Sequence, residues 1–164
     1  IDILVNNAGG GFAAEFMELS ENGQEALIRE NFTSVAHFVR AVVPFVPERG
    51  GSIINLSSIE AQRAAPGFAV YAAMKAAVEN LSRSLALELG SRRIRVNAIA
   101  PGSIDTDMPK SMSKENRQRL KNAVPLKRLG KTEELGECAL FLASKMSNYI
   151  TGTTLHVNGG SLML

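Results

Sequence analysis

Four short segments rich in Ile, Leu and Val constrain the fold of this chain most, because helical patterns separate each segment from the next. The segments are IDILVN (1–6), SIINLS (52–57), RVNAIA (95–100) and TLHVN (154–158). The first three carry apolar residues without strict alternation, which is typical of parallel strands covered on both faces. Strand and helix in turn along the chain predict an α/β fold with a parallel sheet and right-handed crossovers.

The stretches between these strands carry helical signals. Ser20 is placed to cap a helix that runs from 21 to about 46. A second long helix is expected from about 68 to 89, where a glycine follows it. Shorter helices are predicted at 112–122 and 132–144. All 164 residues are expected to belong to one domain.

Composition excludes several classes of function. The net charge is only +2, so no strong field indicates a nucleic acid or an anionic membrane as partner. No apolar run approaches the ~20 residues of a membrane span, and we expect a cytoplasmic protein. The single cysteine, Cys138, excludes an intrachain disulfide and a cysteine-cluster metal site, and no His, Asp and Glu grouping has metal-ligand spacing.

Polar and glycine-rich turns follow three of the four predicted strands. Asn-Asn-Ala-Gly (6–9) follows the first, Ser57-Ser58 the second, and Pro101-Gly102 the third. In parallel sheets, ligands bind in the crevice at the carboxyl ends of the strands. The sequence therefore predicts a functional site at this edge of the sheet.

Tyr71 and Lys75 lie four residues apart in the second long helix, so they share one face. A phenol has a pKa near 10, and a nearby ammonium favours the phenolate. We therefore expect Lys75 to lower the pKa of Tyr71 and make it a useful proton donor and acceptor. A surface tyrosine beside a solvated lysine is the competing interpretation, because this pattern is common.

Two further polar residues favour a site over that interpretation. Ser58 ends the second strand thirteen residues before Tyr71, and the loop between them can bring the two together. Asn31 lies on the apolar stripe of the first long helix, where a polar side chain must find hydrogen-bond partners. Asn31 can equally serve to cap a neighbouring backbone group, and the sequence leaves both roles open.

Taken together, these residues resemble the short-chain dehydrogenase/reductase family. The resemblance rests on motifs whose order and spacing match along the chain, up to VNGG at 157–160. The motifs are the Asn-Asn-Ala-Gly turn, a helix Asn, a strand-end Ser, Tyr-x-x-x-Lys and Pro-Gly, here Asn6-Asn7-Ala8-Gly9, Asn31, Ser58, Tyr71 with Lys75, and Pro101-Gly102.

The resemblance implies an NAD(P)-dependent oxidoreductase that acts on a carbonyl or a secondary alcohol. Tyr71 would be the general acid or base, and Ser58 would hydrogen-bond the substrate oxygen. Lys75 would depress the pKa of Tyr71 and hold the nicotinamide ribose. Asn31 would anchor a water that connects Lys75 to solvent.

The resemblance also implies the cofactor-binding residues, with NAD or NADP left undetermined. Gly9 would let the backbone approach the adenosine half, and Pro101 and Gly102 would shape the turn against the nicotinamide. The Ile104 backbone and the Thr106 hydroxyl would bind its carboxamide. The full set is Asn6, Asn7, Ala8, Gly9, Tyr71, Lys75, Pro101, Gly102, Ile104 and Thr106.

The family's fold is a doubly wound parallel-sheet Rossmann fold, and this chain matches its C-terminal part. The first three strands and the Gly-rich turn have no counterpart here, so we expect residues 1–164 to form a partial NAD(P)-binding domain of a chain of roughly 250 residues. These residues expressed alone are expected to be inactive. The family also implies a homodimer built from the two long helices, or a homotetramer.

The substrate is less constrained. NNAGGGF departs from the turn typical of the family's 3-oxoacyl-carrier-protein reductases, which usually have a bulkier residue after Asn-Asn-Ala-Gly. It is more similar to the 7α-hydroxysteroid dehydrogenase branch, as is VPLKRLG (124–130), and this similarity is loose. A substrate loop is expected at 105–125, with Met108, Met112 and Leu120 suited to an apolar substrate. A non-catalytic NAD(P)-sensing module and an assembly module on the same fold remain alternatives.

Overall fold

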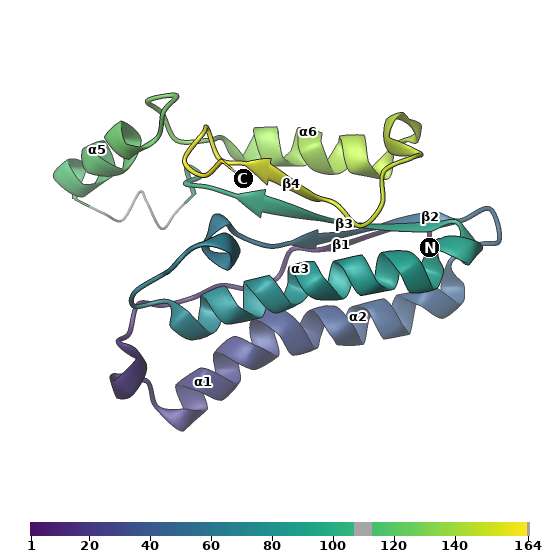
Figure 1. Ribbon diagram of the computed structural model, residues 1–164, viewed down its shortest axis with the longest axis horizontal. Helices are drawn as coiled ribbons and strands as arrows, with labels where there is room; N and C mark the ends of the chain where they lie inside the picture. The colour runs from purple at the N-terminus through teal and green to yellow at the C-terminus, as the bar shows by residue number, and fades with distance from the viewer. Residues whose placement is uncertain (107–112, 164) are drawn as a thin grey trace.

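The computed structural model describes residues 1–106 and 113–163. Its sheet has four parallel strands in the order β1-β2-β3-β4 (Figure 1). The strands are β1 (Ile3–Asn6), β2 (Gly51–Leu56), β3 (Ile94–Pro101) and β4 (Thr154–Val157). The four predicted strands and the parallel α/β fold are thus confirmed, with strand ends that differ by one or two residues.

The register of the sheet brings the carboxyl ends of the strands together. Asn6 lies beside Asn55 in the β1–β2 pair, and Asn55 lies beside Ala98 in the β2–β3 pair. Pro101 lies beside Val157 in the β3–β4 pair. The turns that follow β1, β2 and β3 therefore leave the sheet at one edge.

Helices cover both faces of the sheet. Helices α1 (Glu21–Ile28), α2 (Ser34–Val42) and α3 (Ala69–Leu89) lie on one face, and α6 (Thr132–Ala143) lies on the other (Figure 1). Helix α5 (Lys114–Ala123) lies beyond the carboxyl ends of β3 and β4. Short 3₁₀ turns complete the described elements: Phe16–Glu18, Val43–Phe45, Ile59–Gln62 (η4), Gly90–Arg92 and Lys145–Ser147.

The first long helix was predicted to be continuous, and this is wrong. A π-helical turn, Arg29–Thr33, separates α1 from α2, and the end of the segment is a 3₁₀ turn around Pro44. The predicted cap is correct, because the Ser20 hydroxyl accepts a hydrogen bond from the Gly23 N–H at 3.1 Å. Helix α3 ends at Leu89 as expected, although the left-handed residue after it is Arg93 (φ 57°) rather than a glycine.

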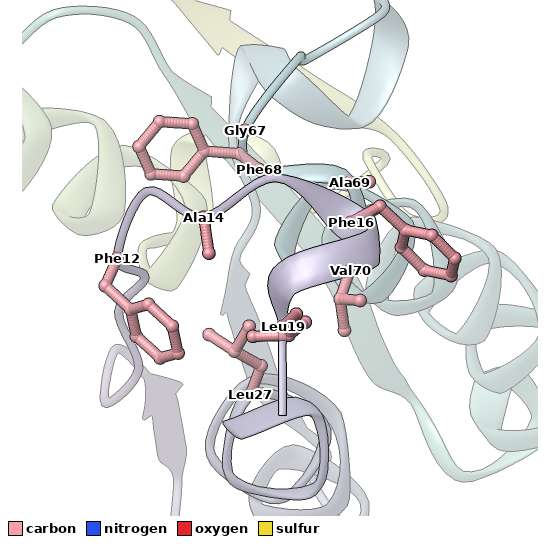
Figure 2. Close-up of a pocket in the computed structure, with 9 residues that line it drawn as sticks. All are labelled: Phe12, Ala14, Phe16, Leu19, Leu27, Gly67, Phe68, Ala69 and Val70. Atoms are coloured by element: carbon pink, nitrogen blue, oxygen red, sulfur yellow. The ribbon is translucent and has the colours of Figure 1, made fainter. Parts of the chain in front are cut away.

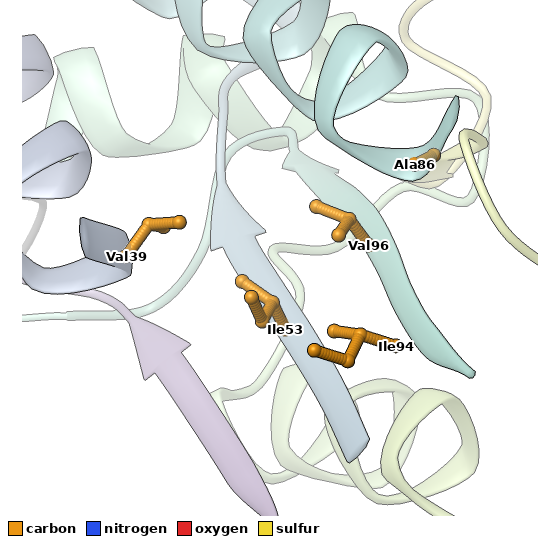
Figure 3. Close-up of a cluster of buried hydrophobic side chains, with 5 residues drawn as sticks. All are labelled: Val39, Ile53, Ala86, Ile94 and Val96. Atoms are coloured by element: carbon orange, nitrogen blue, oxygen red, sulfur yellow. The ribbon is translucent and has the colours of Figure 1, made fainter. Parts of the chain in front are cut away.

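Two apolar clusters hold the layers together. Val39, Ile53, Ala86, Ile94 and Val96 form one cluster between the sheet and helices α2 and α3 (Figure 3). Neighbours along each strand point to opposite faces, so Ile54 and Ile99 join Leu142 in a second cluster under α6. Each fully buried aliphatic side chain of this size contributes about 1.5–3 kcal/mol.

Strand β1 departs from the expectation that it is covered on both faces. Ile3 is 49% exposed and Val5 is 45% exposed, whereas the central residues of β2 and β3 are buried. The reason is the position of α6, which packs over β2 and β3. In the part of the chain that the structure describes, the outer edge of β1 also pairs with no strand.

Candidate active site

Tyr71 and Lys75 lie on the first turns of α3, near the carboxyl ends of the strands. Lys75 is buried, and its Nζ lies 5.6 Å from the centre of the Tyr71 ring. The same Nζ donates a hydrogen bond to the Leu56 carbonyl oxygen at 2.9 Å. The end of β2 thus fixes the ammonium beside the phenol, which excludes the interpretation of a solvated surface lysine.

Burial dominates the ionisation of both groups. Burial lowers the pKa of Lys75 from its ordinary 10.5 to about 8. It also raises the pKa of Tyr71; a polar contact with Ser58 opposes this rise, and the Glu60 charge adds to it. The expected lowering of the Tyr71 pKa by Lys75 is therefore wrong for this chain, because desolvation of the phenolate outweighs the favourable interactions.

Ser58 lies two residues after the end of β2 and caps η4. Its hydroxyl accepts a hydrogen bond from the Glu60 N–H at 3.2 Å. The preceding residue, Ser57, is held to β3 through its N–H and the Ile99 carbonyl, 2.7 Å apart. Ser58 is buried against Tyr71, so the loop from 58 to 71 does return the chain as the sequence indicated.

Asn31 lies in the π-helical turn and is fully buried. Its Nδ2 donates hydrogen bonds to the Gly10 carbonyl at 2.8 Å and to the Leu27 carbonyl at 2.9 Å. Its Oδ1 is buried and has no hydrogen-bond partner within the described residues. Asn31 therefore anchors the glycine-rich turn, as the structural interpretation expected, and still presents a free acceptor.

Gly9 is required by both backbone conformation and space. Its φ is +145°, a value that side-chain-bearing residues rarely adopt. A Cβ at this position would lie 2.8 Å from Asn31 Oδ1 and 3.5 Å from Lys75 Nζ. The turn after β1 thus passes directly over the polar end of the site.

A cleft of about 540 Å³ opens beside these residues. It brings together predicted site residues from the ends of β2 and β3 and from α3, with Gly10 and Gly11 after β1. The residues that line it are Gly10, Gly11, Ser58, Ile59, Glu60, Phe68, Tyr71, Gly102, Ser103, Ile104, Thr106 and Leu120. Met108 and Met112, predicted for the substrate loop, lie outside the described residues.

Of the remaining predicted cofactor-binding residues, Asn6, Asn7, Ala8 and Pro101 do not line this cleft, whereas Gly102 does. Asn6 points into the fold, where its Nδ2 donates to Asn55 Oδ1 at 2.7 Å. Asn7 and Ala8 are exposed after it, and Pro101 ends β3. The Gly102 N–H donates to the Val157 carbonyl at 3.0 Å, which joins this turn to β4.

Two neighbouring residues were not singled out from the sequence. Gly11 lies against the Tyr71 ring, where a Cβ would come within 3.1 Å of Cδ2. Glu60 also lines the cleft, and its carboxylate pairs with Arg63 at 2.5 Å. The run of three glycines was a signal for the first, whereas nothing local distinguished the second.

A small hollow of about 10 Å³ lies between the loop after β1 and the start of α3 (Figure 2). Phe12, Leu19 and Leu27 line it with other apolar side chains, and Ala14 N–H donates to the Gly67 carbonyl at 2.9 Å. A space of this size holds one water at most. The apolar side chains around this hollow pack the loop after β1 against the start of α3.

We find no group of three His, Cys, Asp or Glu side chains that could hold a metal ion within residues 1–106 and 113–163.

Comparison with known proteins identifies the protein family to which this fold and cleft belong. Residues 1–161 match the family model described as enoyl-(acyl carrier protein) reductase. The chain therefore belongs to the short-chain dehydrogenase/reductase family.

Its relatives come from several bacteria. It is 47% identical over 161 residues to a 3-oxoacyl-[acyl-carrier-protein] reductase of Chlamydia trachomatis, covering 98% of this chain and 65% of the relative. It is 41% identical to the enzyme of the same name from Thermotoga maritima, with the same coverage. The chain thus spans slightly less than two thirds of the length of these curated relatives.

A solved structure agrees on the fold. A blue fluorescent protein from a metagenomic library, in complex with NADPH, superposes with a TM-score of 0.93 and is 33% identical, covering 99% of this chain and 66% of that chain. The relatives from Chlamydia trachomatis and Thermotoga maritima support the 3-oxoacyl reductase branch of the family. The loose likeness to the 7α-hydroxysteroid dehydrogenase branch stays a prediction.

Proposed function

We propose that this chain carries the catalytic part of an NAD(P)-dependent oxidoreductase that interconverts a carbonyl and a secondary alcohol. The observation that carries the proposal is that Ser58 and Tyr71 line one cleft, while Lys75 Nζ lies 5.6 Å from the centre of the Tyr71 ring. We also propose that residues 1–164 form the catalytic part of an NAD(P)-binding Rossmann-fold domain.

The residues present fit a nicotinamide dinucleotide. Lys75 Nζ has three N–H groups and makes one described hydrogen bond, so it can also bind ribose hydroxyls. The unpartnered Asn31 Oδ1 and the close backbone at Gly9 offer further polar contacts beside it. Gly102, Ile104 and Thr106 would hold the nicotinamide end.

The bound nicotinamide supplies or accepts the hydride. In reduction, the Ser58 hydroxyl hydrogen-bonds the carbonyl oxygen and stabilises the charge that develops there. Tyr71 gives its proton to that oxygen as the carbon gains the hydride, which leaves a secondary alcohol and a phenolate. The Lys75 cation favours that phenolate until a proton from solvent restores the phenol. Oxidation runs the same steps in reverse.

A 3-oxoacyl thioester is the substrate class that we propose. The relatives named above support it, and the apolar side chains of Ile59, Phe68 and Leu120 in the cleft suit an acyl chain. Because the structural neighbour was solved in complex with NADPH, NADPH is the first cofactor to test, with NADH beside it.

Self-association through the long helices is also proposed. Phe38 on α2, Phe45 just after it and Leu87 on α3 are apolar and exposed, which suits a homodimer or homotetramer. No helix in the described ranges is long and apolar enough to cross a membrane. A cytoplasmic location stays a prediction.

The proposal is tested by oxidation of NADPH and NADH, followed by the loss of absorbance of the reduced nicotinamide, in the protein that carries these residues. The substrates are a short 3-oxoacyl thioester, a 7-oxosteroid and a simple ketone. We expect the thioester to give the highest kcat/KM. Preference for the oxosteroid would contradict the substrate class, and the absence of turnover with all three would contradict the proposed reaction.

A further inference from the structure

Glu79 is a buried carboxylate that the proposed chemistry does not use. Its side chain is 1% exposed on α3, one turn after Lys75 and two turns after Tyr71, on the same helix face. In the described residues no ion pair involves it. Burying a carboxylate is costly unless hydrogen bonds compensate, so its partners indicate what it does.

Both carboxylate oxygens of Glu79 accept hydrogen bonds from the segment 57–62. Oε1 accepts from the Ser57 hydroxyl at 2.7 Å, and Oε2 accepts from the Gln62 amide. Ser57 Oγ also lies 3.2 Å from the Lys75 carbonyl oxygen. One side chain therefore holds the first and the last residue of a six-residue segment to α3.

Most of the residues between these two anchors line the cleft. Of the four, Ser58, Ile59 and Glu60 do so, and Ser58 is the proposed ligand of the substrate oxygen. Because both oxygens of the Glu79 carboxyl group accept, Glu79 orients the Ser57 hydroxyl and the Gln62 amide toward itself. Glu79 thus joins the segment that carries Ser58 to the helix that carries Tyr71.

We propose that Glu79 is a positioning residue, which aligns the Ser58 hydroxyl with the Tyr71 phenol through Ser57 and Gln62. The inference rests on the proposed function, since Ser58 matters only if the cleft reduces a carbonyl. It adds a residue that touches neither substrate nor cofactor and that the sequence motifs do not include.

The test is Glu79→Gln, which keeps the shape of the side chain but presents an amide N–H₂ to one of its two donors. We expect kcat for thioester reduction to fall about 10-fold, while the KM for NADPH stays within about 2-fold, because the cofactor contacts are untouched. Glu88→Gln, an exposed glutamate on the same helix, is the matched control and should leave kcat unchanged. Wild-type kcat in Glu79→Gln would overturn the inference.

A double-mutant cycle separates positioning from general stability. If Glu79 acts through Ser58, Glu79→Gln should cost less than about 2-fold in kcat when Ser58 is already alanine. An equal loss in both backgrounds would overturn the inference.

Exchange of the two partners is a second test. The double variant Gln62→Glu with Glu79→Gln rebuilds the amide–carboxylate hydrogen bond and should restore most of kcat. A combined loss equal to the product of the single losses would count against the inference.

The two proposals fail in distinguishable ways. Activity that survives Tyr71→Phe would remove the proposed function itself. Activity that depends on Tyr71 and Ser58 but not on Glu79 would remove only the positioning role.

Discussion

At the scale of single residues, burial sets the ionisation of the site. Lys75 and Tyr71 both lose hydration in the fold, and the loss disfavours their charged forms. The pKa of Lys75 falls to about 8, whereas that of Tyr71 rises above its ordinary value. Over the pH range of most assays, the phenol therefore keeps its proton and the ammonium is the group that titrates.

This order of pKa values predicts the pH dependence of reduction. A lysine is charged below its pKa, so Lys75 is cationic at pH 7 and mostly neutral at pH 9. We expect kcat/KM for carbonyl reduction to be flat near pH 7 and to fall as the pH rises through about 8. Lys75→Arg should move this fall to higher pH, because a guanidinium stays charged. A fall at the same pH in the arginine variant would assign it to another group.

At the scale of elements, a buried polar chain joins β1, β2 and α3. Asn6 Nδ2 donates to Asn55 Oδ1 at 2.7 Å, and Asn55 Nδ2 donates to Ser82 Oγ at 2.8 Å. Ser82 Oγ in turn donates to the Val78 carbonyl at 2.8 Å. This series of hydrogen bonds fixes the turn after β1 relative to the helix that carries Tyr71.

Asn55→Ala should therefore destabilise the protein. The change leaves Asn6 without its acceptor and opens a small cavity, and together these cost roughly 2–4 kcal/mol in the free energy of unfolding. Chemical denaturation measures the change. Asn80→Ala, at an exposed position of α3, is the control and should change the free energy by less than about 0.5 kcal/mol. Equal stabilities of the two variants would show that the buried chain contributes little.

Sequence patterns predicted these elements well where the signal was local. Strand residues and the Ser20 cap depend on neighbours in sequence, and each was found as expected. The π-helical turn at Asn31 was missed because one inserted residue hardly changes the apolar periodicity of a helix. An uninterrupted helix was therefore the natural prediction, and the structure shows that it is wrong.

At the scale of the whole molecule, the sequence could not predict the features that depend on the packing of segments far apart in the chain. In the sequence, nothing distinguishes Glu79 from an ordinary helix glutamate. Only the fold brings Ser57 and Gln62, which come well before it in the chain, into hydrogen-bond contact with it. The raised pKa of Tyr71 needs the same information, because desolvation is a property of the folded chain. The exposure of β1 likewise follows from where α6 packs. The order and spacing of the motifs nevertheless indicated the family, and the sequence pointed to half of the residues that line the cleft: Ser58, Tyr71, Gly102, Ile104, Thr106 and Leu120.

The central claim is that Tyr71 is the proton donor of a carbonyl reductase, and the chain contains its own control. Its other tyrosine, Tyr149, is fully exposed. In the protein that carries this chain, Tyr71→Phe should lower kcat for NADPH-dependent reduction of a 3-oxoacyl thioester by about 100-fold or more, the scale of a lost general acid. The KM for NADPH should change little, and Tyr149→Phe should keep wild-type kcat. Turnover by Tyr71→Phe within a few-fold of that of Tyr149→Phe would contradict the account.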